Sequence, residues 1–72
     1  MSYYVAEQYT GGVYVSGIQK TPPAILYSSD IEQAMWSLDS SKVQQVIDKN
    51  SIPNVAVSLK SGLHPGSKPP IQ

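Results

Sequence analysis

The chain has 72 residues, no cysteine and no arginine, and its five lysines balance its five acidic residues to a formal net charge of zero. It therefore has no disulfide, and a single histidine, His64, is too few for a structural metal site. Zero net charge without arginine is unfavourable for a non-specific nucleic-acid binder or a membrane-surface protein. The N-terminus does not resemble a signal peptide and no apolar run reaches membrane-spanning length, so we expect a cytoplasmic protein.

Two runs rich in Tyr and Val, residues 3–9 and 13–18, are separated by Thr10-Gly11-Gly12, a pattern typical of a β-hairpin. A three-residue loop that opposes Tyr9 to Val13 groups the apolar side chains better than a two-residue turn does. This register places on one face Tyr3, Val5, Tyr9, Val13 and Val15, and on the other Tyr4, Ala6, Gln8, Tyr14, Ser16 and Ile18.

The segment Lys20-Thr21-Pro22-Pro23 is expected to interrupt the sheet, because proline cannot donate a hydrogen bond to a strand ladder. The apolar run that follows, residues 24–27, has two interpretations. It is either a third strand or a buried connection to a helix.

The stretch 29–50 has helical periodicity. Ser29 and Glu32 have the spacing of a capping box, which predicts a helix start. The apolar stripe loses its period at residues 39–41, Asp-Ser-Ser, which favour helix caps. We therefore expect two short helices, residues 30–38 and residues 41–49.

Alternating apolar residues over 55–59 predict a last strand, and the proline- and glycine-rich residues 61–72 predict a flexible tail. The expected fold is a single α+β domain over residues 1–60, a small antiparallel sheet of hairpin and C-terminal strand covered on one face by one or two short helices. Self-association would add burial to so small a domain. The expected core comprises Val5, Tyr9, Val13, Val15, Ile25, Ile31, Ala34, Met35, Leu38, Val43, Val46, Ile47, Val55, Val57 and Leu59.

The aromatic residues are five tyrosines and one tryptophan, without phenylalanine. Tyr and Trp combine apolar area with a polar tip and are enriched at interfaces. We therefore expect Tyr4, Tyr14 and Trp36 to be the partner-binding anchors. The alternative is that these side chains are half-buried and only fill a small core.

Base stacking on the paired tyrosines is disfavoured, because stacking platforms lie in basic grooves and only Lys20 is near this sheet, which also carries Glu7. The Thr10-Gly11-Gly12 loop lacks the helix start that follows a phosphate-binding loop. Catalysis is disfavoured because His64 lies in the expected tail and the acidic residues are scattered. We expect no catalytic residue, no cofactor and no metal.

The chain contains, in order, YYVAEQY, a turn, VYVSGI, SSDIEQAMWSLDSSKVQQVI and VAVSL. Over residues 3–59 this succession resembles small uncharacterised accessory proteins of phages and prophages of low-GC Gram-positive bacteria. The resemblance implies a binding protein, because such proteins are mostly binders and some inhibit host enzymes or defence systems. It implies no activity and no site residues.

The leading hypothesis is a non-enzymatic, oligomeric interaction protein that binds one protein partner through Tyr4, Tyr14 and Trp36 and modulates or inhibits it. Two alternatives stay open. One is an oligomer that encloses a nucleotide-like ligand, and the other is a single-stranded nucleic-acid binder with steep salt dependence.

Overall fold

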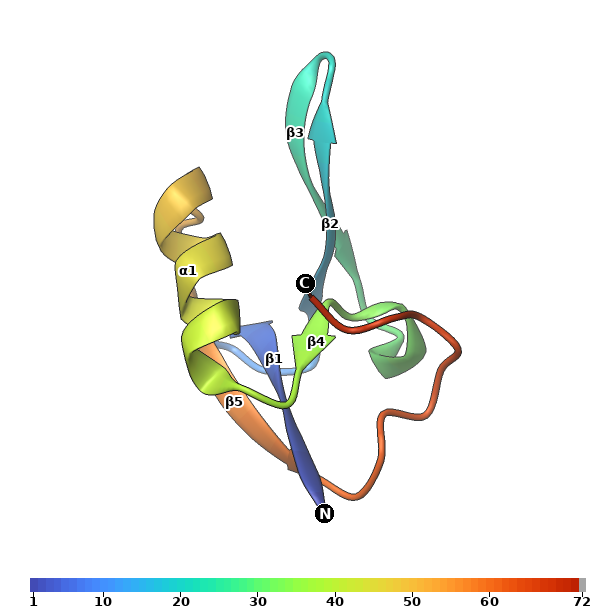
Figure 1. Cartoon of the computed structure of the whole chain (residues 1–72). Helices are drawn as coiled ribbons and strands as arrows, with labels where there is room; N and C mark the ends of the chain where they lie inside the picture. Colours follow the sequence, from blue (N-terminus) through green and yellow to red (C-terminus); the bar gives the residue numbers. More distant parts are fainter. Residues whose placement is uncertain (72) are drawn as a thin grey trace.

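The structure is a computed structural model that describes residues 1–71 (Figure 1). Its strands are β1 (Ser2–Gln8), β2 (Tyr14–Lys20), β3 (Pro23–Ser28), β4 (Trp36–Ser37) and β5 (Val55–Ser61). A one-turn 3-10 helix, η1 (Ile31–Gln33), precedes β4, and the α-helix α1 spans Ser40–Asn50. The predicted α+β class is confirmed, but the sheet has five antiparallel strands and is larger than predicted, while the described residues form one α-helix.

Strand β1 is the centre of the sheet. One side of β1 pairs with β5 along its whole length, and the other side pairs with β2 at one end and with β4 at the other. Strand β2 then runs past β1 to pair with β3. The apolar run 24–27 is therefore a strand, and β3 lies at an edge of the sheet.

Residues 9–13 lie between β1 and β2. Because Gln8 is bonded to Val13, the closed loop has four residues, 9–12, and the predicted three-residue loop is wrong. The backbone N–H of Gln8 donates to the carbonyl oxygen of Val13 over 2.9 Å, which closes the loop. Gly11 and Gly12 both have left-handed φ values, of 81° and 78°, which glycine adopts without steric cost. Sequence spacing does not reveal that two successive residues take this conformation.

This register opposes Glu7 to Tyr14. Because side chains alternate along a strand, one residue of slip moves a side chain to the other face. Tyr14 therefore packs with Tyr3 and Val5 on one face, whereas Tyr4 packs on the opposite face, toward α1. The prediction that Tyr4 and Tyr14 share a face is wrong.

The first predicted helix, residues 30–38, does not form. Its capping site is Asp30 rather than Ser29, since Asp30 Oδ1 accepts the N–H of Glu32 over 3.0 Å, and the helix ends after one 3-10 turn. Ala34 is already extended, with φ −66° and ψ 138°. A nine-residue helix is marginal by itself, and pairing of the following residues with β1 replaces it.

Residues 34–36 alternate between the two faces of the sheet. Ala34 and Trp36 pack beside β1 on one face, and Met35 packs on the other. Leu38, which the helical stripe placed in the core, is 64% exposed. The apolar residues of this segment fit both the helical period and the two-residue period of a strand. The pairing of Trp36 and Ser37 with β1 favours the strand.

The second predicted helix is α1. Asp39 caps its start by accepting the Ser41 N–H over 2.9 Å, and Ser51, with φ 50°, ends it. Val43 and Ile47 form its buried face. No helix of the described residues is long and apolar enough to span a membrane.

Two core clusters lie on opposite faces of β1. The cluster under α1 comprises Ala6, Val15, Val43, Ile47, Ile52 and Val55, and the other comprises Tyr3, Val5 and Ala34. Besides Leu38, two residues expected in the core are exposed. Tyr9, 73% exposed, falls in the four-residue loop, and Leu59, 59% exposed, lies in β5 outside both clusters.

Residues 62–71, here called the C-terminal segment, return across the second cluster, in contrast to the free tail that composition predicts. The indole N–H of Trp36 donates to the carbonyl of Lys68 over 2.8 Å, and the N–H of Ile71 donates to the carbonyl of Trp36 over 2.8 Å. The Lys68 ammonium donates to the carbonyls of Gln33, over 2.8 Å, and Ser16. The acceptors are backbone carbonyl oxygens, so the amino-acid composition of the segment does not predict these contacts.

Candidate functional site

The structure does not bring the three predicted anchors to one surface. Tyr4 lies on the α1 side of the sheet, and Tyr14 and Trp36 lie on the other side. All three are half-buried, and the indole N–H of Trp36 is bonded within the chain. Trp36 thus serves to fasten the C-terminal segment.

His64 completes an aromatic stack that sequence reasoning missed. Its ring is stacked on that of Trp36, with centroids 4.9 Å apart and an interplanar angle of 7°, and meets the ring of Tyr3 edge-on at 5.4 Å. His64 Nδ1 accepts the N–H of Gly66 over 3.2 Å. The histidine is therefore a buried structural contact of the C-terminal segment, and no local sequence pattern around it signals this.

Two acidic residues, Glu7 and Asp39, already have hydrogen-bond partners within the chain. Glu7 forms an ion pair with Lys60 over 2.9 Å and accepts the N–H of Gly12. The hydrogen bond from Lys60, aided by that from Gly12, lowers the pKa of Glu7. On α1, the hydrogen bonds from Ser41 lower the pKa of Asp39. Within residues 1–71 no three His, Asp or Glu side chains converge as a metal site requires.

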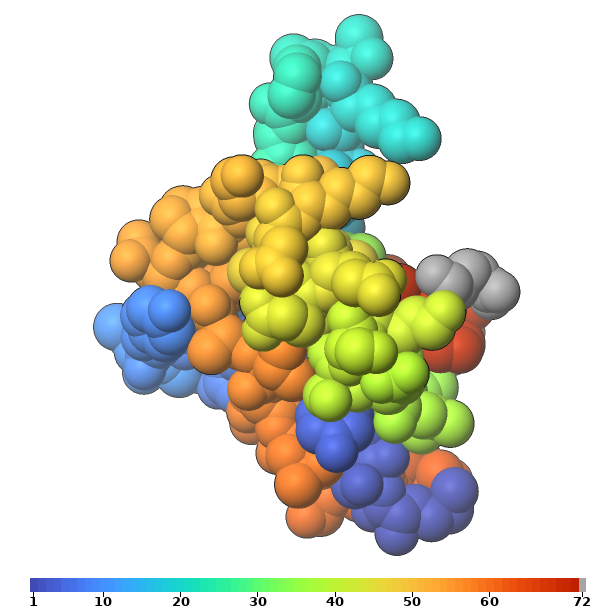
Figure 2. Space-filling view, turned by 60° about the vertical axis from the view of Figure 1, so that its left-hand side comes forward, coloured from blue at the N-terminus to red at the C-terminus, as the bar shows by residue number. Residues whose placement is uncertain are grey.

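The hairpin of β2 and β3, here called the arm, projects from the body (Figures 1 and 2). Its tip is Thr21-Pro22, joined by a cis peptide bond, and Lys20 faces Pro23 as the last strand pair. These residues thus join two strands, and the expected break in the sheet is wrong, because prolines are tolerated at a tip and on an edge.

The outer strand of the arm, β3, carries no charged residue over its six positions, PAILYS. Leu26 is 44% exposed and Tyr27 is 41% exposed. The strand pairs with β2 alone among the described residues, so one side of its backbone is open. An open, apolar, uncharged edge is a template for the addition of another strand.

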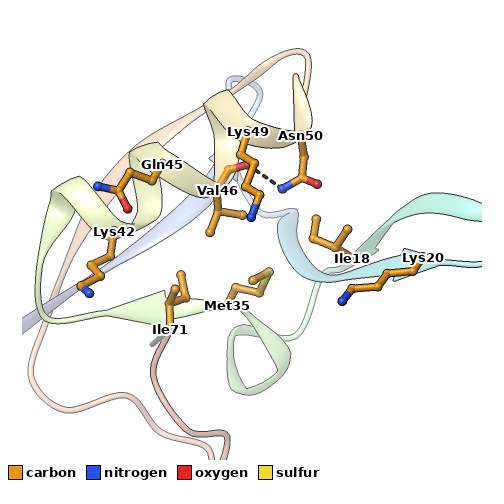
Figure 3. Close-up of a pocket in the computed structure, with 9 residues that line it drawn as sticks. All are labelled: Ile18, Lys20, Met35, Lys42, Gln45, Val46, Lys49, Asn50 and Ile71. Carbon is orange, nitrogen blue, oxygen red and sulfur yellow. Dashed lines mark hydrogen bonds between the residues drawn. The ribbon is translucent and has the colours of Figure 1, made fainter.

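A groove of about 340 Å³ lies between α1 and the base of the arm (Figure 3). Its apolar floor consists of Ile18 from β2, Met35 from the segment before β4, Val46 from α1 and Ile71 from the C-terminal segment. The groove therefore depends on four parts of the chain that only the tertiary fold brings together.

Three of the five lysines, Lys20, Lys42 and Lys49, line this groove, and none of its lining residues is acidic. Gln45 and Asn50 are its other polar residues, and the Asn50 amide donates to a backbone carbonyl of α1 over 2.9 Å. A second hollow of about 390 Å³ continues from the groove along the arm. It shares Ile18, Lys20 and Asn50 with the groove and adds Gln19, Pro23, Ala24 and Ile25.

No family model, curated protein or solved structure matches this chain. Its function is therefore argued from its own surfaces, and the open edge of β3 and the lysine-lined groove are the two used below.

Proposed function

We propose that this protein is a non-enzymatic interaction module that binds a protein partner by pairing one of the partner's strands with the open edge of β3. The observation that carries the proposal is the uncharged, exposed edge strand on a projecting arm. Proteins that stay monomeric commonly protect such edges with charges, prolines or bulges. Here Pro23 stands only at the start of β3 and the irregular pairing lies in β2, between Val15 and Gly17, so residues 24–28 remain an uncharged edge. Backbone hydrogen bonds would supply affinity. Leu26 and Tyr27, which are adjacent and therefore lie on opposite faces of the arm, would supply specificity through the partner side chains on each face.

A role without chemistry is supported by how the acidic side chains are used. Glu7 is paired with Lys60, and Asp30 and Asp39 cap η1 and α1. The proposal includes a cytoplasmic phage or prophage accessory role, as the resemblance implies. The protein would act by occupying a site on a host or defence protein.

The test compares Leu26→Lys with Leu59→Lys. Both leucines are exposed and lie on strands at opposite edges of the sheet, so the two changes add the same charge at similar structural cost. Tagged wild type and both variants are used to capture proteins from a lysate of a bacterium that meets the protein naturally, with circular dichroism as the folding control. We expect one partner that wild type and Leu59→Lys retain and Leu26→Lys loses.

Two outcomes contradict the proposal. If Leu26→Lys retains the partner and Leu59→Lys loses it, the partner binds at Leu59 and at Tyr4, which is paired with Leu59 between β1 and β5. Capture of no partner by the wild type would remove the protein-binding interpretation.

The same open edge also permits self-association, since an uncharged strand can pair with a second copy of itself without charge repulsion. Two β3 strands in antiparallel pairing would join two sheets about a two-fold axis. Sedimentation velocity distinguishes this from a monomer. If wild type sediments as a dimer and Leu26→Lys as a monomer, the edge serves self-pairing, and it is then unavailable to a partner.

A further inference from the structure

We infer that the groove between α1 and the base of the arm binds a small organic anion that has an apolar body and a carboxylate or phosphate group. This site is distinct from the edge of β3, so the inference does not depend on the proposed partner.

The size and lining of the groove suit a small molecule. Its volume of about 340 Å³ lies at the lower end of the range of about 300–1,000 Å³ for small-molecule sites. The floor of Ile18, Met35, Val46 and Ile71 is aliphatic apart from one thioether, and Met35 adapts to irregular ligand shapes. This floor offers contact to an alkyl chain or a flat ring.

The charge of the groove selects an anion. Lys42 and Lys49 are seven residues apart, two turns of α1, so they share one helix face with Val46, and Lys20 approaches from the arm (Figure 3). None of the three lysines forms a salt bridge within residues 1–71. The salt bridge found there joins Lys60 to Glu7, on the face of the sheet opposite α1.

The acidic residues lie elsewhere. Glu7 is bonded to Lys60, Asp30 and Asp39 cap helices, Glu32 lines a different hollow, and Asp48 accepts a hydrogen bond from Gln44 on α1. A protein of zero net charge thus concentrates positive charge at one apolar groove. The flexible lysine stems can cover the ligand's apolar body while their ammonium groups meet its anionic end.

The test follows amide signals of the full chain by NMR during titration with four probes. Octanoate and adenosine monophosphate are the two anions, and octanol and adenosine are their neutral counterparts. We expect saturable shifts at residues 18–20, 42–50 and 71 with at least one anion, and binding weaker by about tenfold for its neutral counterpart. A preference for octanoate identifies a linear carboxylate, and a preference for the nucleotide identifies an aromatic phosphate.

Matched variants test the lysines. The double variant Lys42→Gln/Lys49→Gln should weaken anion binding by about fivefold or more, as expected for the loss of partly exposed charge contacts. Thr10→Glu changes the net charge in the same direction in the loop between β1 and β2, outside the groove, and should leave the affinity unchanged.

Three results would overturn the inference. These are the absence of saturable binding by either anion, equal binding of anion and neutral counterpart, and an equal loss of affinity in Thr10→Glu and the double lysine variant.

Discussion

At the scale of single residues, polar contacts decide features that periodicity leaves open. Glu7 stands between Val5 and Tyr9 in the alternation of the first strand, so in the predicted hairpin it falls on an otherwise apolar face. In the structure its carboxylate bonds the Gly12 N–H and the Lys60 ammonium, and so holds the β1–β2 loop and ties β1 to β5. A charged residue on an otherwise apolar face thus has polar partners in the observed register.

The pairing of Glu7 predicts a specific pH dependence. Because Lys60 and Gly12 lower the pKa of Glu7 in the folded state, this contribution to stability is present above the ordinary glutamate pKa and is lost as pH falls through the folded-state value. Urea unfolding should therefore show the free energy of unfolding decreasing as the pH falls below about 4.3, the ordinary glutamate pKa. Glu7→Gln should reduce this decrease, and Asp39, whose pKa is also lowered, should account for part of what remains. An unchanged pH profile in Glu7→Gln would show that the pair does not contribute.

Gly66 matters for a steric reason, because the chain passes close to another backbone segment at this position. A Cβ at this position would lie 2.5 Å from the carbonyl oxygen of Glu32, whereas a Cβ at Gly17 would meet Leu26 at an ordinary 3.7 Å. Gly66→Ala should displace the C-terminal segment from Trp36 and shift the fluorescence of this single tryptophan, and Gly17→Ala should not. Equal spectra for both variants would contradict the close approach of Gly66.

At the scale of elements, local pattern predicts where segments lie better than it predicts their type. The hairpin strands, α1 and β5 lie near their predicted positions, because their capping and alternation are local. Residues 34–37 are not helical although their spacing fits a helix. Trp36 and Ser37 pair with β1, and Ala34 and Met35 pack on opposite faces of the sheet.

This difference can be measured by comparing Val43→Ala with Leu38→Ala. Val43 is 1% exposed between α1 and the sheet, and its truncation should lower the free energy of unfolding by about 2 kcal/mol. Leu38 is 64% exposed, and its truncation should change stability by less than about 0.5 kcal/mol. Chemical denaturation measures both. A large decrease in the free energy of unfolding of Leu38→Ala would contradict the exposed position of Leu38 and would support the predicted helix over residues 30–38.

At the scale of the whole molecule, long-range contacts unite segments that composition separates. The C-terminal segment reaches β2, η1 and β4 through hydrogen bonds and through the stack of His64 on Trp36. Its end supplies Ile71 to the groove. The two candidate surfaces are likewise properties of the assembled chain, since the arm exposes β3 and α1 faces the arm's base.

Deletion of residues 62–72 tests whether this segment belongs to the folded body. Because it covers Trp36 and Tyr3, its removal should lower the free energy of unfolding by about 2 kcal/mol, the scale of exposing one large aromatic side chain. Thermal unfolding of the full chain and the deletion measures this. Equal midpoints would support the free tail that composition predicts.

The α+β class, the positions of the hairpin, α1 and β5, and the apolar residues of the α1 face follow from the amino-acid sequence, because capping, turn residues and alternation act over a few neighbours. The hairpin register, the strand at Trp36, the course of the C-terminal segment and the grouping of Lys20, Lys42 and Lys49 are visible in the folded chain alone. These features depend on contacts between residues far apart in the chain. The predicted anchors illustrate this dependence. A register one residue away from the predicted one puts Tyr4 and Tyr14 on opposite faces of the sheet, and the candidate sites are therefore the arm and the groove.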